Sequence, residues 1–155
     1  VGNRIGAGEE EKAFRYAARS LMLVFLGALA LGALIFFVAG QILSFYKVSS
    51  TVVFYAQNIF RVMALTLWVR MLNLVNYVGV LRSGGDTRFA FLMDVGVMWT
   101  VGVPLAFLGA FVLHLPVYWV YLLILTEELI KWFLGMARFL SRRWINNLAR
   151  GFLPG

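Results

Sequence analysis

The sequence contains no cysteine and a single histidine, His114. The lack of cysteine excludes disulfide bonds, thiol catalysis and thiolate metal sites, and one imidazole cannot by itself form a histidine metal site. No cluster of Asp, Glu and His near an interface suggests a catalytic constellation either. We therefore predict a protein that is not an enzyme and that needs no cofactor and no metal.

Charged residues are also scarce. They make up 14% of the 155 residues, whereas hydrophobic residues make up 62%, against roughly 45–50% in soluble proteins. A soluble domain of this size leaves about 30% of its unfolded-chain surface exposed and could not hide so much apolar surface. The composition predicts an integral membrane protein. The excess of 14 Lys and Arg over 7 Asp and Glu then indicates cytoplasmic loops beside anionic lipid rather than a nucleic-acid partner.

Four stretches of the chain are long and apolar enough to cross a bilayer, which takes about 20 helical residues. We therefore predict an all-α, polytopic helical membrane protein. Residues 1–12 are predicted as a cytoplasmic loop and residues 141–155 as a basic cytoplasmic tail. The transmembrane part is predicted at 13–140, with its four spans at about 20–43, 62–82, 89–113 and 117–139.

An even number of spans places both ends of the chain on the same side of the membrane. Positively charged loops stay in the cytoplasm, so we expect a multi-pass plasma-membrane protein with both ends cytoplasmic. The chain begins at Val1 rather than at Met, and we expect it to be part of a larger protein. The cations on the expected cytoplasmic side are Arg4, Lys12, Arg15, Arg19, Arg82, Arg88, Arg138, Arg142, Arg143 and Arg150.

Polar side chains interrupt the second predicted span. Thr66, Arg70, Asn73 and Tyr77 recur at helical spacing and share one face of the helix. Ionisable groups inside a membrane are costly and by default suggest a functional role, so this stripe is expected to face a wet cavity or a bundle interior. The alternative that remains open is hydrogen bonding between helices that only fixes their packing.

The fourth predicted span carries Glu127, Glu128 and Lys131. Lys131 lies one turn from both acids and can pair well with only one of them, which leaves the other for Arg70 or for a proton. At about 1.5 Å per residue, Arg70 and Glu128 fall at similar depths, as do Asp94 and Lys131, so two ion pairs are possible, with a purely structural role as the alternative. The candidate residues of a substrate or ion pathway are Arg70, Asn73, Tyr77, Asp94, Glu127, Glu128 and Lys131.

Two loop motifs are rich in glycine: VGNRIGAG at residues 1–8 and GVLRSGGDTRFAF at residues 79–91. The first lacks the preceding strand and the following Lys-Ser or Lys-Thr of a phosphate-binding loop, so its small residues are expected to allow close packing. In the second, Gly84 and Gly85 permit the positive φ angles of a sharp reversal, and Asp86 is placed to cap the third span.

Two further expectations concern individual residues in the third and fourth spans. Pro104 is expected to kink the third span, because proline is a common cause of helix kinks. Tyr118, Trp119 and Tyr121 lie just inside the expected outer boundary, where aromatic belts occur.

The two loop motifs, at this separation and with four spans, resemble the matching loops of multidrug and toxic compound extrusion (MATE) transporters. Such proteins have twelve helices in two lobes, and this chain is similar to the carboxy-terminal part of the second lobe. The resemblance implies a secondary-active multidrug efflux antiporter that exports organic, often cationic, compounds in exchange for H+ or Na+ by alternating access. It also implies, as partners, the remaining helices of the same transporter, membrane lipid, the small organic substrate and the coupling ion.

Two other functions remain open at the level of sequence. A lipid-linked precursor flippase shares the two-lobe helical plan, but flippases of that type tend to add helices and a more cationic cavity. A non-transporting helical membrane subunit, or the membrane anchor of an enzyme, would also be consistent with apolar spans. The absence of a catalytic constellation disfavours the anchor of an enzyme.

Overall fold

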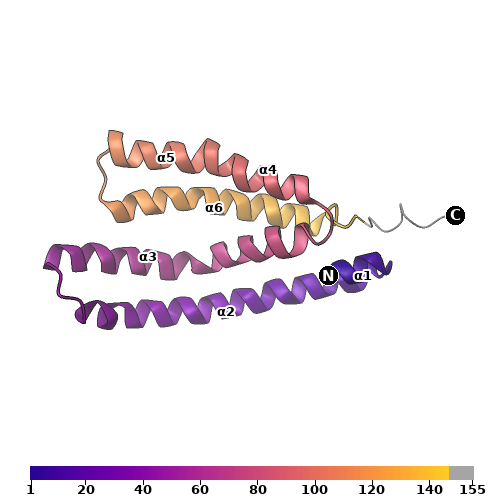
Figure 1. Ribbon diagram of the computed structural model, residues 1–155, viewed down its shortest axis with the longest axis horizontal. Helices are drawn as coiled ribbons and strands as arrows, with labels where there is room; N and C mark the ends of the chain where they lie inside the picture. The colour runs from indigo at the N-terminus through magenta and orange to yellow at the C-terminus, as the bar shows by residue number, and fades with distance from the viewer. Residues whose placement is uncertain (147–155) are drawn as a thin grey trace.

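Four long helical rods lie side by side in the computed structural model, which describes residues 1–146 (Figure 1). The predicted all-α fold is confirmed for these residues. The second and third rods each contain π-helical segments, labelled η. The elements in chain order are α1 (Gly2–Gly6), α2 (Glu10–Ser44), α3 (Ser50–Leu74), η1 (Val75–Leu81), α4 (Thr87–Val97), η2 (Met98–Gly102), α5 (Val103–Phe107), η3 (Leu108–Val112) and α6 (Val117–Leu140).

The spatial order of the rods differs from their order in the chain. α2 packs against α3, α3 packs against α6, and α6 packs against the rod that runs from α4 to η3 (Figure 1). The last helix therefore lies between the second and third rods, and α2 forms one edge of the bundle. Because α3 and α6 are direct neighbours, the polar residues of the second and fourth predicted spans can meet.

Three rods are long and apolar enough to cross a membrane: Glu10–Ser44, Ser50–Leu81 and Thr87–Val112. Each of these rods ends within one residue of the end of the corresponding predicted span, but it begins earlier than that span does. α6 has 24 residues, about 36 Å at 1.5 Å per residue, and matches the fourth predicted span. Its middle carries three charged residues between positions 127 and 131, so its crossing of the membrane stays a prediction.

A buried cluster of apolar side chains lies toward the end of the bundle that carries both described ends of the chain (Figure 1). Trp144, which follows α6, is fully buried there and packs against Gly84, where an added Cβ would overlap the Trp144 ring and carbonyl oxygen. The start of the predicted basic tail is therefore part of the packed core. Residues 147–155 of that predicted tail lie outside the described residues.

The turn between the second and third rods corrects two predictions. Gly85 has a positive φ of 87° as expected, but Gly84 does not; glycine is needed there because Trp144 approaches so closely. Asp86 occupies the N-cap position of α4 without a side-chain capping bond. Its carboxylate instead accepts a hydrogen bond of 2.7 Å from Arg138 Nε of α6, because the charged partner offers a stronger interaction than a backbone N–H.

The predicted loop at residues 1–12 is wrong in part, because it contains α1 and the start of α2. Glu9 joins these helices by accepting hydrogen bonds of 2.6 Å from both Lys12 and Arg4, and these bonds hold the pKa of Glu9 below its usual value. Of the glycines in this motif, Gly2 lies close to the second motif, since an added Cβ would be 3.2 Å from the Ser83 carbonyl oxygen. The two motifs thus pack together.

Pro104 does not break the third rod, which is a single helical unit from Thr87 to Val112 (Figure 1). The π-helical turn η2 ends two residues before it, at Gly102. A wider π-helical turn at this point suits a proline, which has no backbone N–H to donate to the preceding turn. The helix therefore continues through Pro104 with a local change of helical pitch, and the expected kink stays a prediction.

Candidate functional site

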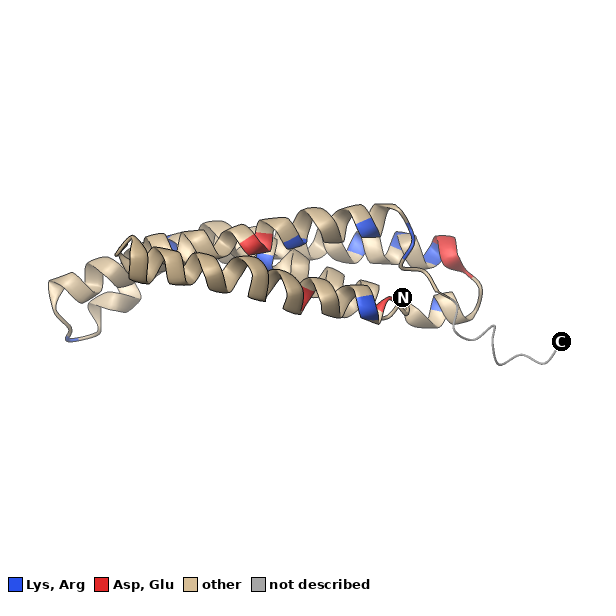
Figure 2. Cartoon of the chain, turned by 90° about the horizontal axis from the view of Figure 1, so that it is seen from above, with Lys and Arg blue, Asp and Glu red and all other residues tan. Residues whose placement is uncertain are grey.

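Most charged residues of the described chain lie toward the end of the bundle that carries the chain ends, and a second group lies midway along the helices (Figure 2). The group midway along includes five ionisable side chains that contact one another across α3, α4 and α6. Together with two hydrogen-bonding neighbours they form what we call the mid-bundle cluster. Its members are Arg70, Asn73, Tyr77, Asp94, Glu127, Glu128 and Lys131.

Arg70 of α3 and Glu128 of α6 form the first part of the mid-bundle cluster. Arg70 Nε lies 3.7 Å from Glu128 Oε1, and Asn73 Nδ2, one turn further along α3, donates to Glu128 Oε2 at 2.7 Å and to its backbone oxygen at 2.8 Å. Arg70 Nη1 also donates to the Tyr121 hydroxyl at 2.8 Å. The predicted pair of Arg70 and Glu128 is confirmed, and Asn73 fixes the carboxylate that receives the guanidinium.

Lys131 of α6 forms the second part of the cluster, between two carboxylates. Its Nζ lies 3.2 Å from Glu127 Oε1, one turn back on the same helix, and 3.4 Å from Asp94 Oδ1 of α4. The Lys131 and Glu127 side chains are almost fully buried, whereas the Asp94 side chain is 54% exposed. The predicted pair of Asp94 and Lys131 is confirmed, and Lys131 selects Glu127 rather than Glu128 on its own helix.

Two glycines make room for the cluster. Gly102, at the end of η2, faces Glu127, and an added Cβ would overlap the Glu127 Oε2 atom. Gly135 of α6 faces the side chain of Tyr77, with an added Cβ 2.9 Å from two ring carbons and from the hydroxyl oxygen. This close approach lets the Tyr77 hydroxyl donate to the Lys131 backbone oxygen at 2.7 Å. Both contacts lie beside π-helical segments, which occur preferentially at functional sites.

A cavity of about 250 Å³ opens between α3, η1, α4 and α6 at this cluster. All members of the mid-bundle cluster except Glu127 line it. The Asn73 Oδ1 and Glu127 Oε2 atoms are buried without a hydrogen-bond donor among the described residues. The cavity itself offers two cationic groups and two carboxylates, which suits the binding of water, a proton or a polar group.

The seven candidate residues from the sequence are thus brought together, although no contact establishes that they form a pathway. Thr66, at the start of the predicted stripe, lies outside the cluster, because its hydroxyl donates to the Val62 backbone oxygen at 2.6 Å. Tyr121, expected in an aromatic belt, instead contacts Arg70 through its hydroxyl and its ring face, 5.3 Å from the guanidinium carbon. Asn76 is buried and its Oδ1 has no donor among the described residues.

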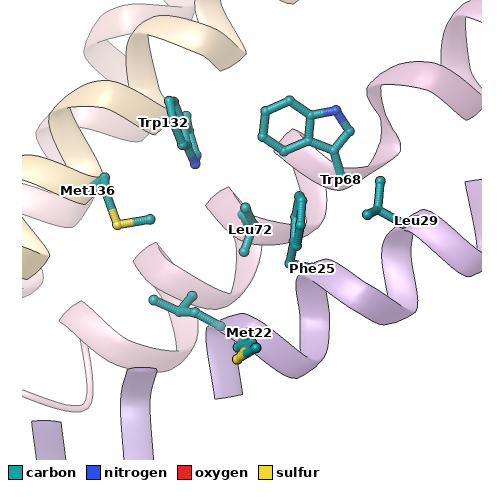
Figure 3. Close-up of a pocket in the computed structure, with 8 residues that line it drawn as sticks. Met22, Phe25, Leu29, Trp68, Leu72, Trp132 and Met136 are labelled. Atoms are coloured by element: carbon teal, nitrogen blue, oxygen red, sulfur yellow. The ribbon is translucent and has the colours of Figure 1, made fainter. Parts of the chain in front are cut away.

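A second opening, which we call the Trp groove, was not predicted from the sequence. It measures about 510 Å³ and is bordered by α2, α3 and α6 (Figure 3). The Trp68 and Trp132 rings meet nearly edge to face, with centroids 5.8 Å apart, and Trp132 Nε1 has no acceptor among the described residues. The lining residues are Leu21, Met22, Phe25, Leu29, Trp68, Leu72, Trp132 and Met136.

Comparison with known proteins gives one family and one relative. The MatE family model matches residues 1–108, which include both loop motifs but not α6. A protein of Bacillus subtilis (strain 168) described as uncharacterized transporter YisQ is 23% identical over 145 residues, covering 94% of this chain and 32% of that protein. The chain therefore spans about a third of the length of the curated relative it matches. No solved structure matches the chain.

Proposed function

The chain belongs to the MatE family of transporters, and we propose that it supplies four membrane-spanning helices to a secondary-active multidrug efflux antiporter. In this proposal α6 crosses the membrane beside the three apolar rods. The whole protein exports organic, often cationic, compounds by alternating access, and an inward flow of H+ or Na+ drives the export. The remaining helices of the same transporter and the surrounding lipid are its partners.

The mid-bundle cluster is the observation that carries this proposal. Five ionisable side chains at the middle of a membrane bundle cost free energy, because they are removed from water. Such groups typically face a bundle interior or an ion pathway. Arg70 and Asp94 have side chains that are 38% and 54% exposed in the described chain, and lipid would leave them without polar partners. We infer that this side of the cluster faces the remaining helices or a water-filled path between the two lobes.

The Trp groove supports the organic nature of the substrate. Its lining is apolar and includes two Trp rings and Phe25, and aromatic faces attract organic cations by cation–π interaction. The groove and the mid-bundle cluster share α3 and α6, so a movement of either helix alters both. This arrangement suits a protein in which ion binding and substrate binding influence each other.

The first prediction is that transport requires both lobes. Alternating access needs two halves that move around a central site, and these four helices supply only part of one half. The full-length protein in liposomes should extrude ethidium when a proton or sodium gradient is imposed, whereas the 155-residue chain alone should not. Saturable ethidium flux through the 155-residue chain alone would contradict the two-lobe mechanism, and no flux through the full-length protein under either gradient would contradict antiport.

The second prediction concerns orientation. Ser50, at the start of α3, and Ser83, in the turn before α4, lie at opposite ends of a rod long enough to cross a membrane. In a full-length protein otherwise free of cysteine, Ser50→Cys should react with an impermeant maleimide from outside intact cells, and Ser83→Cys should react only after the cells are opened. Ser141→Cys, after α6, should behave like Ser83→Cys if α6 also crosses. Labelling of Ser83→Cys from outside intact cells would show that the orientation in the membrane is the opposite of the one proposed.

A further inference from the structure

The charges of the mid-bundle cluster do not balance. It contains three carboxylates, from Asp94, Glu127 and Glu128, but only two cations, from Arg70 and Lys131. α2, which borders the other side of α3, carries no charged residue between positions 20 and 46, and the remaining titratable neighbours on α3, η1 and α6 are the phenols of Tyr77 and Tyr121. One negative charge is therefore left without a partner among the described residues, at a depth where such a charge is costly.

Glu128 is not the carboxylate left over. It has its own cation in Arg70 and a hydrogen bond from Asn73, so the surplus belongs to the two acids on either side of Lys131. One ammonium can neutralise only one of them. Glu127 is the more buried of the two, and its other oxygen is packed against Gly102, whereas Asp94 lines the cavity and is half exposed.

The space between Asp94 and Glu127 is already filled. Lys131 Nζ lies 3.4 Å from one carboxylate and 3.2 Å from the other, which is where a bound monovalent cation would have to lie to neutralise both. Tyr77 holds the backbone of Lys131 by donating to its carbonyl oxygen. The ammonium is thus fixed in place by its burial, by its helix and by two carboxylates.

A proton needs no such space. It can bind an Asp94 carboxylate oxygen from water in the cavity, form an O–H bond there and cancel the surplus charge, while Lys131 stays protonated and pairs with Glu127 alone. Asp94 lines the cavity and its side chain is 54% exposed, so water that enters the cavity can reach this carboxylate.

Building on the proposed antiport function, we propose that Lys131 is a resident cation that excludes Na+ from the site between Asp94 and Glu127, and that Asp94 exchanges one proton in its place. Lys131 and Glu127 are positioning residues in this scheme, and Asp94 is the group that gains and loses the proton. The site then couples to H+ because the chain supplies its own counter-ion for Glu127.

The test uses the purified full-length protein in detergent, so that it does not depend on transport. Wild-type protein should show no saturable binding of radioactive sodium at alkaline pH and should release one more proton than Asp94→Asn when the pH is raised. Lys131→Gln should bind sodium saturably, at least about tenfold more tightly than the weakest affinity the assay detects, a gain of at least about 1.4 kcal/mol over wild type. Sodium should then raise the melting temperature of Lys131→Gln, because bound ligand stabilises the folded state.

Two control variants separate charge from structure. Lys131→Arg keeps the cation and should stay insensitive to sodium, and Lys12→Gln removes an exposed lysine from α2 without any change in sodium binding. If Lys131→Gln does not fold, sodium binding by the wild type and the difference in proton release between the wild type and Asp94→Asn still test the proposal. Acid-sensitive sodium binding by the wild type, or an unchanged proton release in Asp94→Asn, would overturn the proposal. Failure of ethidium transport under every gradient would instead refute the antiport function and leave these binding results unaffected.

Discussion

Arg70→Ala in the full-length protein is expected to reduce drug efflux at least about tenfold, which corresponds to about 1.4 kcal/mol of lost stabilisation in the transport cycle. The substitution removes the cation beside Glu128, the hydrogen bond to Tyr121 and the contact with its ring. Glu128 then keeps only the bonds from Asn73, and an uncompensated carboxylate at the centre of a membrane helix costs about 2.5 kcal/mol or more on insertion scales. Ethidium efflux per folded molecule measures this effect.

The double variant separates folding from transport. Glu128→Gln keeps an oxygen that can accept from Asn73 but removes the charge, so combining it with Arg70→Ala should restore much of the lost thermal stability. The two changes should therefore be non-additive, with a coupling energy of about 0.5–3 kcal/mol as expected for residues in direct contact. Transport should stay low in the double variant if, as we propose, the cycle uses the ion pair that this variant lacks.

Arg61→Ala is the matched control for this experiment. Arg61 lies on the same helix, nearer to its start at Ser50, and forms no ion pair within the described residues. Its replacement should leave both efflux and thermal stability close to wild type. If Arg70→Ala lowers thermal stability but leaves efflux per folded molecule at the level of Arg61→Ala, the polar stripe on α3 only fixes packing, which is the alternative left open by the sequence.

The ion pairs of the cluster could be predicted from the sequence because depth along a membrane helix follows from residue number. A constant rise of about 1.5 Å per residue places Arg70 level with Glu128, and Asp94 level with Lys131, whatever the arrangement of the helices around one another. Charged groups at equal depth in an apolar bundle then have few other partners to choose from. For this reason the sequence predicted both the pairs and the members of the cluster.

The lateral arrangement of the helices could not be predicted in the same way. In a soluble protein the apolar face of a helix marks the side that packs, but lipid is as apolar as a helix interior and removes that signal. Nothing in the sequence therefore indicated that α6 lies between α3 and α4, or that α2, α3 and α6 border the Trp groove. The contact of Tyr121 with Arg70 was missed for a related reason, since a long arginine side chain reaches both Glu128 and a tyrosine two turns away.

The contacts of the glycines were the least predictable feature. Gly84, Gly102 and Gly135 each make room for a large or charged side chain from another element, and their own sequence neighbours give no sign of it. A glycine in a membrane helix is equally consistent with a close helix crossing, a turn or simple tolerance. Only the positions of the backbones distinguish a glycine at a close helix crossing from one that is simply tolerated. α2 carries a glycine of each kind, Gly32 and Gly27.

Gly32→Ala on α2 is expected to destabilise the protein, whereas Gly27→Ala on the same helix is not. An added Cβ at Gly32 would lie 2.5 Å from the Ala64 backbone oxygen of α3, while no atom of another described element lies within 4 Å of one at Gly27. Because Ala64 contributes a backbone atom, the two helices must move apart, and overpacking of this kind costs about 1–3 kcal/mol.

The control variant Gly27→Ala is expected to change the stability in the opposite direction from Gly32→Ala. Alanine at an uncrowded helical position stabilises by about 0.5–1 kcal/mol relative to glycine, so Gly27→Ala should unfold at the wild-type temperature or above it. Gly32→Ala should unfold at a clearly lower temperature, as followed by the loss of monodisperse full-length protein after heating. Since α3 carries Arg70 and Asn73, moving it away from α2 should also lower ethidium efflux. Equal melting temperatures for the two variants would show that α2 and α3 are not packed backbone to backbone at Gly32 and Ala64.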